Sequence, residues 1–187
     1  ESLEELLVRV RACRHCEAFI EPRPVVRLAA GARIAIIGQA PGTKVHASGV
    51  PWDDPSGDHL REWLDVDDAT FADPTCFAIV PMGFCYPGKG PSADLPPREE
   101  CAPLWHGPLL DRLSPTLVLL VGQYAQAAYL PDRCRTLTAT VREFERFGDY
   151  LPLPHPSWRS RGWRKRNPWF DEQVLPVLRA RVQAALA

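Results

Sequence analysis

The sequence predicts an α/β fold built around a short, mostly parallel sheet of four strands. Short apolar runs alternate along the chain with segments of helical periodicity, which is the pattern of successive strand–helix units. The 187 residues are 45% hydrophobic and 24% charged, a balance that suits one globular domain with a real core. Segments rich in glycine and proline follow the strands, so we expect the ligand site beyond their carboxyl ends.

Four segments are predicted strands. The first is a β-branched run that ends in glycine, the pattern of a buried parallel strand. In chain order the strands are RIAIIG (33–38), CFAIVPM (76–82), TLVLLVG (116–122) and DYLPLP (149–154). Their carboxyl ends lead into GQAPG, PMGFCYPG, GQYAQ and PHPSW, which we expect on one rim of the sheet.

Five segments are predicted helices. Apolar residues recur at helical spacing in the first, and Ser56 is the predicted N-cap of the second. The helix at 98–113 is expected to break near Gly107 and Pro108, and the last to kink at Pro176. In chain order the helices span 2–12, 56–64, 98–113, 123–130 and 168–186.

Charge and hydropathy narrow the class of protein. The net charge is −1, so any nucleic-acid partner must be met by local basic charge. No apolar run approaches the roughly 18 residues that indicate a membrane span. The first ten residues are amphipathic and acidic, unlike a signal peptide. We therefore expect a cytoplasmic, monomeric protein that does not insert into membranes.

Four of the six cysteines have the spacing of a metal site. Cys13 and Cys16 form a C-x-x-C unit, whose two thiolates can bind one metal centre. Cys85 and Cys101, with 15 residues between them, are the candidates to complete four ligands. Disulfides are not expected without a secretory signal. Zinc and an iron–sulfur cluster both take four thiolates, so the spacing leaves both open.

Several motifs together resemble the uracil-DNA glycosylase superfamily. IIGQAPG (36–42) is similar to its first motif, close to the GEAPG form of the iron–sulfur family four, and PLPHPSW (152–158) resembles its HPS loop. The stretch 48–64 is similar to the single-strand-selective monofunctional uracil glycosylases. The resemblance runs from the C-x-x-C unit to the final helix, so it covers most of the chain.

This resemblance implies a three-layer α/β/α sandwich that forms one domain over residues 1–187. It also implies that the four spaced cysteines bind a [4Fe-4S] cluster, with zinc as the alternative. The cluster would be structural, tying the N-terminal segment to the loop between Cys85 and Cys101. The implied ligands are Cys13, Cys16, Cys85 and Cys101.

The implied activity is that of a monofunctional DNA-repair glycosylase. It would hydrolyse the N-glycosidic bond of a deaminated base, uracil or a related one, after flipping that base out of DNA. His155 is expected to donate a hydrogen bond to the base carbonyl as the base leaves. Gln39, Asp53 and Asp54 are candidates to position the attacking water or stabilise the sugar cation. The alternative for both aspartates is a turn or helix cap.

The base pocket departs from the family pattern at one position. Pro81 stands where family-four members have an asparagine that reads the uracil edge, and a proline offers no donor. Backbone groups near Met82 and Gly83 are the expected substitutes; otherwise the preferred lesion is hypoxanthine or xanthine. Trp52 falls where an aromatic ring stacks on the flipped base, with core packing as its alternative. The candidate base-binding residues are Gly38, Ala40, Trp52, Met82 and Gly83.

The basic stretch WRSRGWRKRN (158–167) is expected to form a DNA-facing loop beside the HPS motif. Trp158 or Arg159 would fill the position of the wedge that enters the helix. An ordinary solvated charge run is the alternative. Lys89 is a further phosphate-contact candidate, with an exposed surface side chain as its alternative. The candidate DNA-binding residues are Ser157, Trp158, Arg159, Arg161, Arg164, Lys165 and Arg166.

Two other interpretations stay open at this point. Ala40 replaces a water-activating side chain found in some families, and the asparagine is missing at Pro81. In the first interpretation, these two differences make the chain a catalytically weak or inactive DNA-binding member of the same fold. The other interpretation is a zinc-stabilised protein with a purely structural or interaction role.

Overall fold

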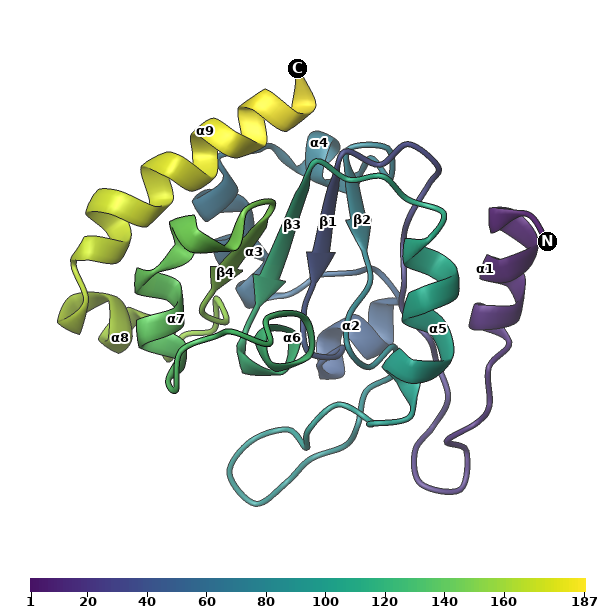
Figure 1. Ribbon diagram of the computed structural model, residues 1–187. Coiled ribbons are helices and arrows are strands. Elements are labelled where there is room, and N and C mark those ends of the chain that lie inside the picture. Colours follow the sequence, from purple (N-terminus) through teal and green to yellow (C-terminus); the bar gives the residue numbers. More distant parts are fainter.

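The centre of the molecule is a four-stranded sheet in the order β2-β1-β3-β4, seen in a computed structural model that describes residues 1–187 (Figure 1). Every neighbouring pair is parallel; Ile34, for example, pairs with Phe77 on one side and with Leu117 on the other. The strands are β1 Ile34–Ile37, β2 Phe77–Ile79, β3 Leu117–Val121 and β4 Tyr150–Leu153. The predicted α/β fold with four strands is confirmed.

Helices cover both faces of this sheet, which gives three layers (Figure 1). On one face, Ile34 and Ile36 pack with residues of α3 and α9 such as Trp63 and Leu178. On the other, the small side chain of Ala35 packs in a cluster formed by α1 and α5. The helices named here are α1 Leu3–Arg11, α3 Pro55–Leu64, α5 Cys101–Leu110 and α9 Leu175–Leu186.

Two helix predictions differ from the structure in detail. Pro108 lies inside α5 without breaking it. The closing helix begins with a π-helical segment that runs directly into α9, and Pro176 is the second residue of α9, just after the change from π to α geometry. The remaining helical elements are α2 Thr43–Ser48, α4 Asp68–Ala72, α6 Gln123–Tyr129, α7 Leu137–Arg142, η1 Phe144–Phe147, α8 Ser160–Arg166 and η2 Phe170–Val174.

The N-cap of α3 is Asp54 rather than Ser56. Its side chain accepts a hydrogen bond from the backbone N–H of Gly57 at 2.8 Å, and Pro55 occupies the first helical position. The helix cap therefore lies two residues earlier in the chain than predicted. No helix combines the length and the apolar character that a bilayer crossing requires.

Candidate active site at the strand ends

A pocket of about 50 Å³ lies beyond the carboxyl ends of the strands. Three segments bring its polar groups: the loop 38–42 after β1, Asp54 before α3, and His155 after β4. Apolar walls surround these groups, as in most sites that enclose a small organic ligand. The walls are Val25, Val45, Pro51, Trp52, Ile79 and Pro81.

His155 is held at this edge by its neighbours on both sides. Pro154 and Pro156 are buried, and Nδ1 of His59 on α3 donates to the carbonyl oxygen of Pro156 at 3.1 Å. Burial of the His155 ring lowers its pKa to about 4. At neutral pH the imidazole is therefore uncharged and retains one N–H to donate.

Trp52 lies next to His155 in the pocket wall. The two ring centroids are 5.8 Å apart and the rings are inclined by 32°. On its other side the indole Cζ2 lies 3.0 Å from the point where a Cβ would sit on Gly38. The ring is thus confined between the end of β1 and the histidine, in the position where the sequence predicts a stacking surface.

Of the two candidate aspartates, the structure places Asp54 in the pocket and Asp53 outside it. Asp53 is exposed and does not line the cavity, so the structure does not bring it together with the other candidate catalytic residues. Asp54 is half-buried, caps α3 and also lines the pocket, so the helix-cap alternative does not exclude a place in the site. Its Oδ1 caps α3, which leaves Oδ2 for a ligand. Burial raises the pKa of Asp54, opposed by the hydrogen bond from Gly57.

The loop after β1 contributes Gly38, Gln39 and Ala40 to the pocket. The side chain of Gln39 lies against Gly122, where Oε1 comes within 2.6 Å of the position that a Cβ would occupy. Gly122 has a φ of +91°, in the left-handed region that glycine adopts without penalty. A glycine at this point therefore gives the Gln39 amide its place beside the pocket.

Met82 and Gly83 do not serve as the predicted substitute for the missing asparagine. The N–H of Met82 donates to the Gly38 carbonyl and that of Gly83 to the Gln39 carbonyl, both at 2.9 Å. Neither residue lines the pocket. The two amides hold the loop after β1 in place instead, because parallel backbone pairing continues past the end of the sheet.

Pro81 does line the pocket, and a buried polar chain behind it fixes its carbonyl group. His106 Nε2 donates to this oxygen at 2.8 Å, and the hydroxyl of Tyr129 donates to Nδ1 of the same ring at 2.6 Å. Burial lowers the pKa of His106 and raises that of Tyr129 to about 12, so both are neutral. No sequence pattern points to His106 and Tyr129, since both residues lie within segments of ordinary helical pattern.

The pocket opens into a wider groove of about 470 Å³, which shares Asp54, His155 and the 39–42 loop with it. Trp158 lines this groove and is 72% exposed. Arg159 is braced: its Nη2 donates to the carbonyl of Ser92 at 3.2 Å, and its guanidinium packs on the Trp158 ring. Lys89 forms an ion pair with Asp94 at 3.4 Å across the same loop.

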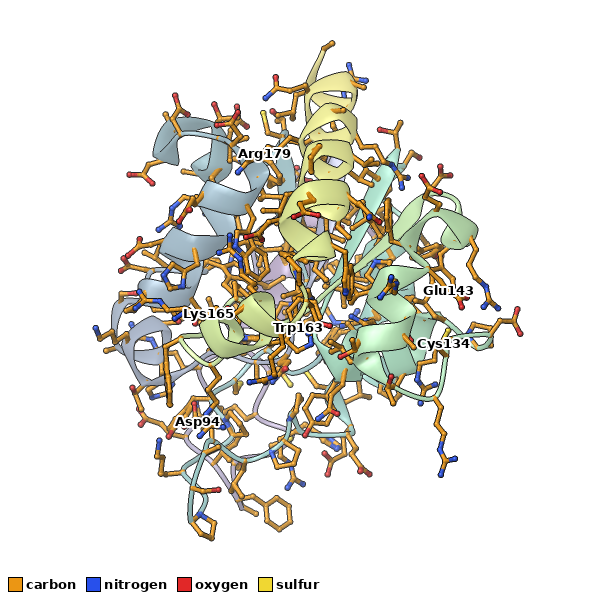
Figure 2. All side chains as sticks on the ribbon, turned by 90° about the vertical axis from the view of Figure 1, so that its left-hand side faces the viewer. Asp94, Cys134, Glu143, Trp163, Lys165 and Arg179 are labelled. Atoms are coloured by element: carbon orange, nitrogen blue, oxygen red, sulfur yellow. The ribbon has the colours of Figure 1, made fainter.

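The basic stretch after the HPS motif is a helix, α8, rather than the predicted loop. Trp163 points inward, donating from Nε1 to Thr138 of α7, while Lys165 is exposed on α8 (Figure 2). Arg164 forms a two-pronged ion pair with Asp171 at 2.8 and 3.0 Å, which engages the guanidinium that the sequence predicts for DNA contact. The exposed basic side chains of α8 that form no ion pair are Arg161, Lys165 and Arg166.

The four spaced cysteines line one apolar cavity on the α1–α5 side of the molecule. All four are free thiols, and the N–H of Phe84 donates to the sulfur of Cys101 at 3.3 Å. Burial raises the pKa of Cys101 to about 12; burial raises that of Cys85 as well, and the nearby Cys13 and Cys16 add to the effect. No three donor side chains converge at the spacing of a single-ion site. What the structure shows is that four cysteines distant in sequence share the lining of one mostly apolar cavity.

One comparison with known proteins bears on these features. A family model described as the Uracil DNA glycosylase superfamily matches residues 26–179. The matched range covers most of the chain and includes the loop after β1, the residues before α3 and the HPS loop with His155.

Proposed function

The chain belongs to the uracil DNA glycosylase superfamily, and we propose that it is a monofunctional DNA glycosylase that removes a deaminated base from DNA. The observation that supports this most directly is the convergence of His155, Asp54 and Trp52 on one apolar pocket. Glycoside hydrolysis needs a stabilised leaving group and a water held near the anomeric carbon. A flipped base also needs a stacking surface.

His155 acts on the leaving group in this proposal. As the N-glycosidic bond breaks, electron density passes to the base, and negative charge grows on its carbonyl oxygen. The neutral imidazole donates its N–H to that oxygen. A fixed donor in a site of low dielectric stabilises this charge more than water does.

Asp54 acts on the attacking water. Its ionised Oδ2 accepts a hydrogen bond from the water and stabilises positive charge on the sugar. The raised pKa of Asp54 makes the carboxylate a better proton acceptor than an exposed aspartate. The fixed position follows from its second function, because the bond to Gly57 anchors the side chain at the start of α3.

The substrate class is deaminated bases rather than uracil alone. Pro81 offers no side-chain donor, and its carbonyl is engaged by His106. The polar groups left to face a base are Gln39, Asp54, His155 and the backbone of the 38–42 loop. Uracil, hypoxanthine and xanthine each carry a ring carbonyl next to an N–H, the pair of groups that a carboxamide such as Gln39 can match.

DNA is held along the groove outside the pocket. Trp158 is the wedge in this proposal, because it is exposed while Arg159 is tied to Ser92. Exposed cations on α8 contact phosphates and supply the local basic charge that the net charge of −1 conceals. These cations are Arg161, Lys165 and Arg166.

A [4Fe-4S] cluster is the proposed ligand of Cys13, Cys16, Cys85 and Cys101. Its inorganic core spaces four thiolates more widely than a single zinc ion does, which suits thiols that share a cavity without converging on one point. When bound it supplies a structural link between the N-terminal segment and the loop before α5. Iron and sulfide analysis, with visible absorption, distinguishes it from zinc.

The activity is tested with labelled oligonucleotides that carry uracil, hypoxanthine, xanthine or mismatched thymine, followed by alkaline cleavage of abasic sites. We expect abasic product from at least one deaminated base. His155→Ala should abolish it, and Cys134→Ser, which lies outside both the pocket and the cysteine cavity, should retain it. If no lesion gives product while the protein still binds DNA, the inactive DNA-binding interpretation replaces this one.

A further inference from the structure

Trp52 has a backbone conformation that bulky residues rarely adopt. Its φ is +59°, in the left-handed region, where a side chain with a Cβ is strained. Such strain persists only where the surrounding structure holds it, and it gathers at functional sites. The contacts that hold Trp52 are therefore informative.

Gly57 is the first of these contacts. The carbonyl oxygen of Trp52 lies so close to Gly57 that a Cβ on this glycine would come within 1.7 Å of it. No side chain fits there without moving the Trp52 backbone. Gly57 is also the residue whose N–H bonds to the Asp54 cap, so the first turn of α3 is fitted closely to the segment before it.

Arg61, one turn further along α3, holds the same oxygen. Its Nη1 donates to the Trp52 carbonyl at 3.2 Å. The guanidinium is itself fixed by ion pairs with Asp58 at 2.6 Å and Asp68 at 2.9 Å, and it packs over the Phe71 ring. Since this side chain is largely buried, the grip on the strained peptide is rigid.

We propose that Arg61 and Gly57 are positioning residues that set the tilt of the Trp52 ring, and thereby its contact with the flipped base. This inference rests on the proposed function, in which Trp52 stacks on the base. The ring has little freedom on its other side, where it meets Gly38 and faces His155. The orientation of the indole therefore depends on the Trp52 backbone. That backbone is held by α3 through Gly57 and Arg61.

The first readout does not depend on activity. The chain has six tryptophans, and Trp52→Phe assigns the Trp52 indole N–H resonance in the nuclear magnetic resonance spectrum. We expect Arg61→Gln and Gly57→Ala each to shift this resonance and leave the other five in place. Arg61→Lys should restore part of the shift. Gly107→Ala is the matched control, because a Cβ on this helical glycine meets nothing within 4 Å.

The second readout is the kinetics of base removal. Arg61→Gln should lower kcat/KM by about 5- to 150-fold, the range that corresponds to losing one base–aromatic stack. In a Trp52→Ala background the same change should have almost no further effect, since Arg61 acts through Trp52.

An unmoved Trp52 resonance in both variants overturns the proposal, whatever the enzyme does. A kinetic loss of equal size in the Trp52→Ala background also overturns it, because Arg61 would then act by another route. If the wild-type protein releases no base, the proposed function fails by itself, and the resonance still decides whether Arg61 and Gly57 hold the ring. Should Gly57→Ala fail to fold, Arg61→Gln and Arg61→Lys carry the test.

Discussion

The ring centroids of the Trp52 indole and the His155 imidazole lie 5.8 Å apart in the lining of the pocket, with the two ring planes inclined by 32°. One ring comes from the segment before α3 and the other from the loop after β4. In the proposed function, a flipped base meets a stacking surface and a hydrogen-bond donor held at a fixed separation.

Asp54→Asn separates catalysis from helix capping. Asparagine caps a helix about as well as aspartate, so the free energy of unfolding should change by less than about 1 kcal/mol. The rate of base removal at neutral pH should fall by about 10²- to 10⁴-fold, the range for loss of a general base. Single-turnover kinetics and urea unfolding measure the two effects. Asp53→Asn is the control, and an equal loss there would contradict the assignment.

His155 should make the folded protein less stable in mild acid. Its folded pKa of about 4 lies below the ordinary value of 6.5. Above pH 6.5 the ring is neutral in both states and the folded protein has its full stability; as the pH falls toward 4, only the unfolded chain takes up the proton. The loss amounts to at most about 3 kcal/mol. Urea unfolding between pH 7 and 4 should show a shallower decline for His155→Gln, and identical slopes would argue against a buried neutral ring.

The buried hydrogen bonds from Tyr129 to His106 and from His106 to the Pro81 carbonyl should contribute to the free energy of unfolding. His106→Ala leaves the Pro81 carbonyl without its buried donor, which costs about 1–3 kcal/mol besides the cavity. Tyr129→Phe removes only the donor to His106 Nδ1, so its effect should be smaller. Chemical denaturation gives both values. A larger loss of unfolding free energy in Tyr129→Phe than in His106→Ala would contradict the dominant role of the bond between His106 and the Pro81 carbonyl.

Substitutions at two neighbouring residues of α8 should have different effects: Lys165 should affect DNA binding and Arg164 should affect stability. Lys165→Ala should weaken DNA binding and reduce the salt dependence, by about 0.9 in the slope of log K against log salt for a lost phosphate contact. Arg164→Ala breaks the ion pair with Asp171 and should lower the melting temperature while leaving that slope unchanged. Fluorescence anisotropy over a salt series, with thermal melts, tests the pair. A reduced slope in Arg164→Ala would restore that residue to the DNA interface.

Loss of the cysteine-bound centre should loosen the N-terminal part of the molecule. Cys101→Ser should remove visible absorption and lower the melting temperature by more than the ~2–4 °C that 1 kcal/mol gives in a domain of this size. Cys134→Ser should leave both unchanged, since this thiol lies outside the cavity. An unaltered iron content in Cys101→Ser would exclude it as a ligand.

The sequence by itself determined the sheet and the location of the site. Buried parallel strands are short continuous apolar runs, and a parallel sheet gathers the loops after its strands at one edge. The loop after β1 and His155 were therefore predicted side by side, although 114 residues lie between Ala40 and His155. The spacing of four cysteines also predicted that they share one site, and in the fold all four line one cavity.

Only the tertiary structure decided which residues of each motif face the pocket. The sequence predicted the same candidate roles for Asp53 and Asp54. The structure distinguishes them because only the Asp54 carboxylate caps α3. The amides of Met82 and Gly83 are used up by backbone pairing, and the buried His106 fixes the Pro81 carbonyl. Of two adjacent cations on α8, Arg164 forms an ion pair with Asp171, whereas Lys165 is exposed to solvent. The bonds of Met82, Gly83 and His106 join segments far apart in the sequence, so local patterns do not encode them. The Asp54 cap and the Arg164–Asp171 pair are short-range, and they were decided by where α3 begins and by how α8 turns into the segment after it.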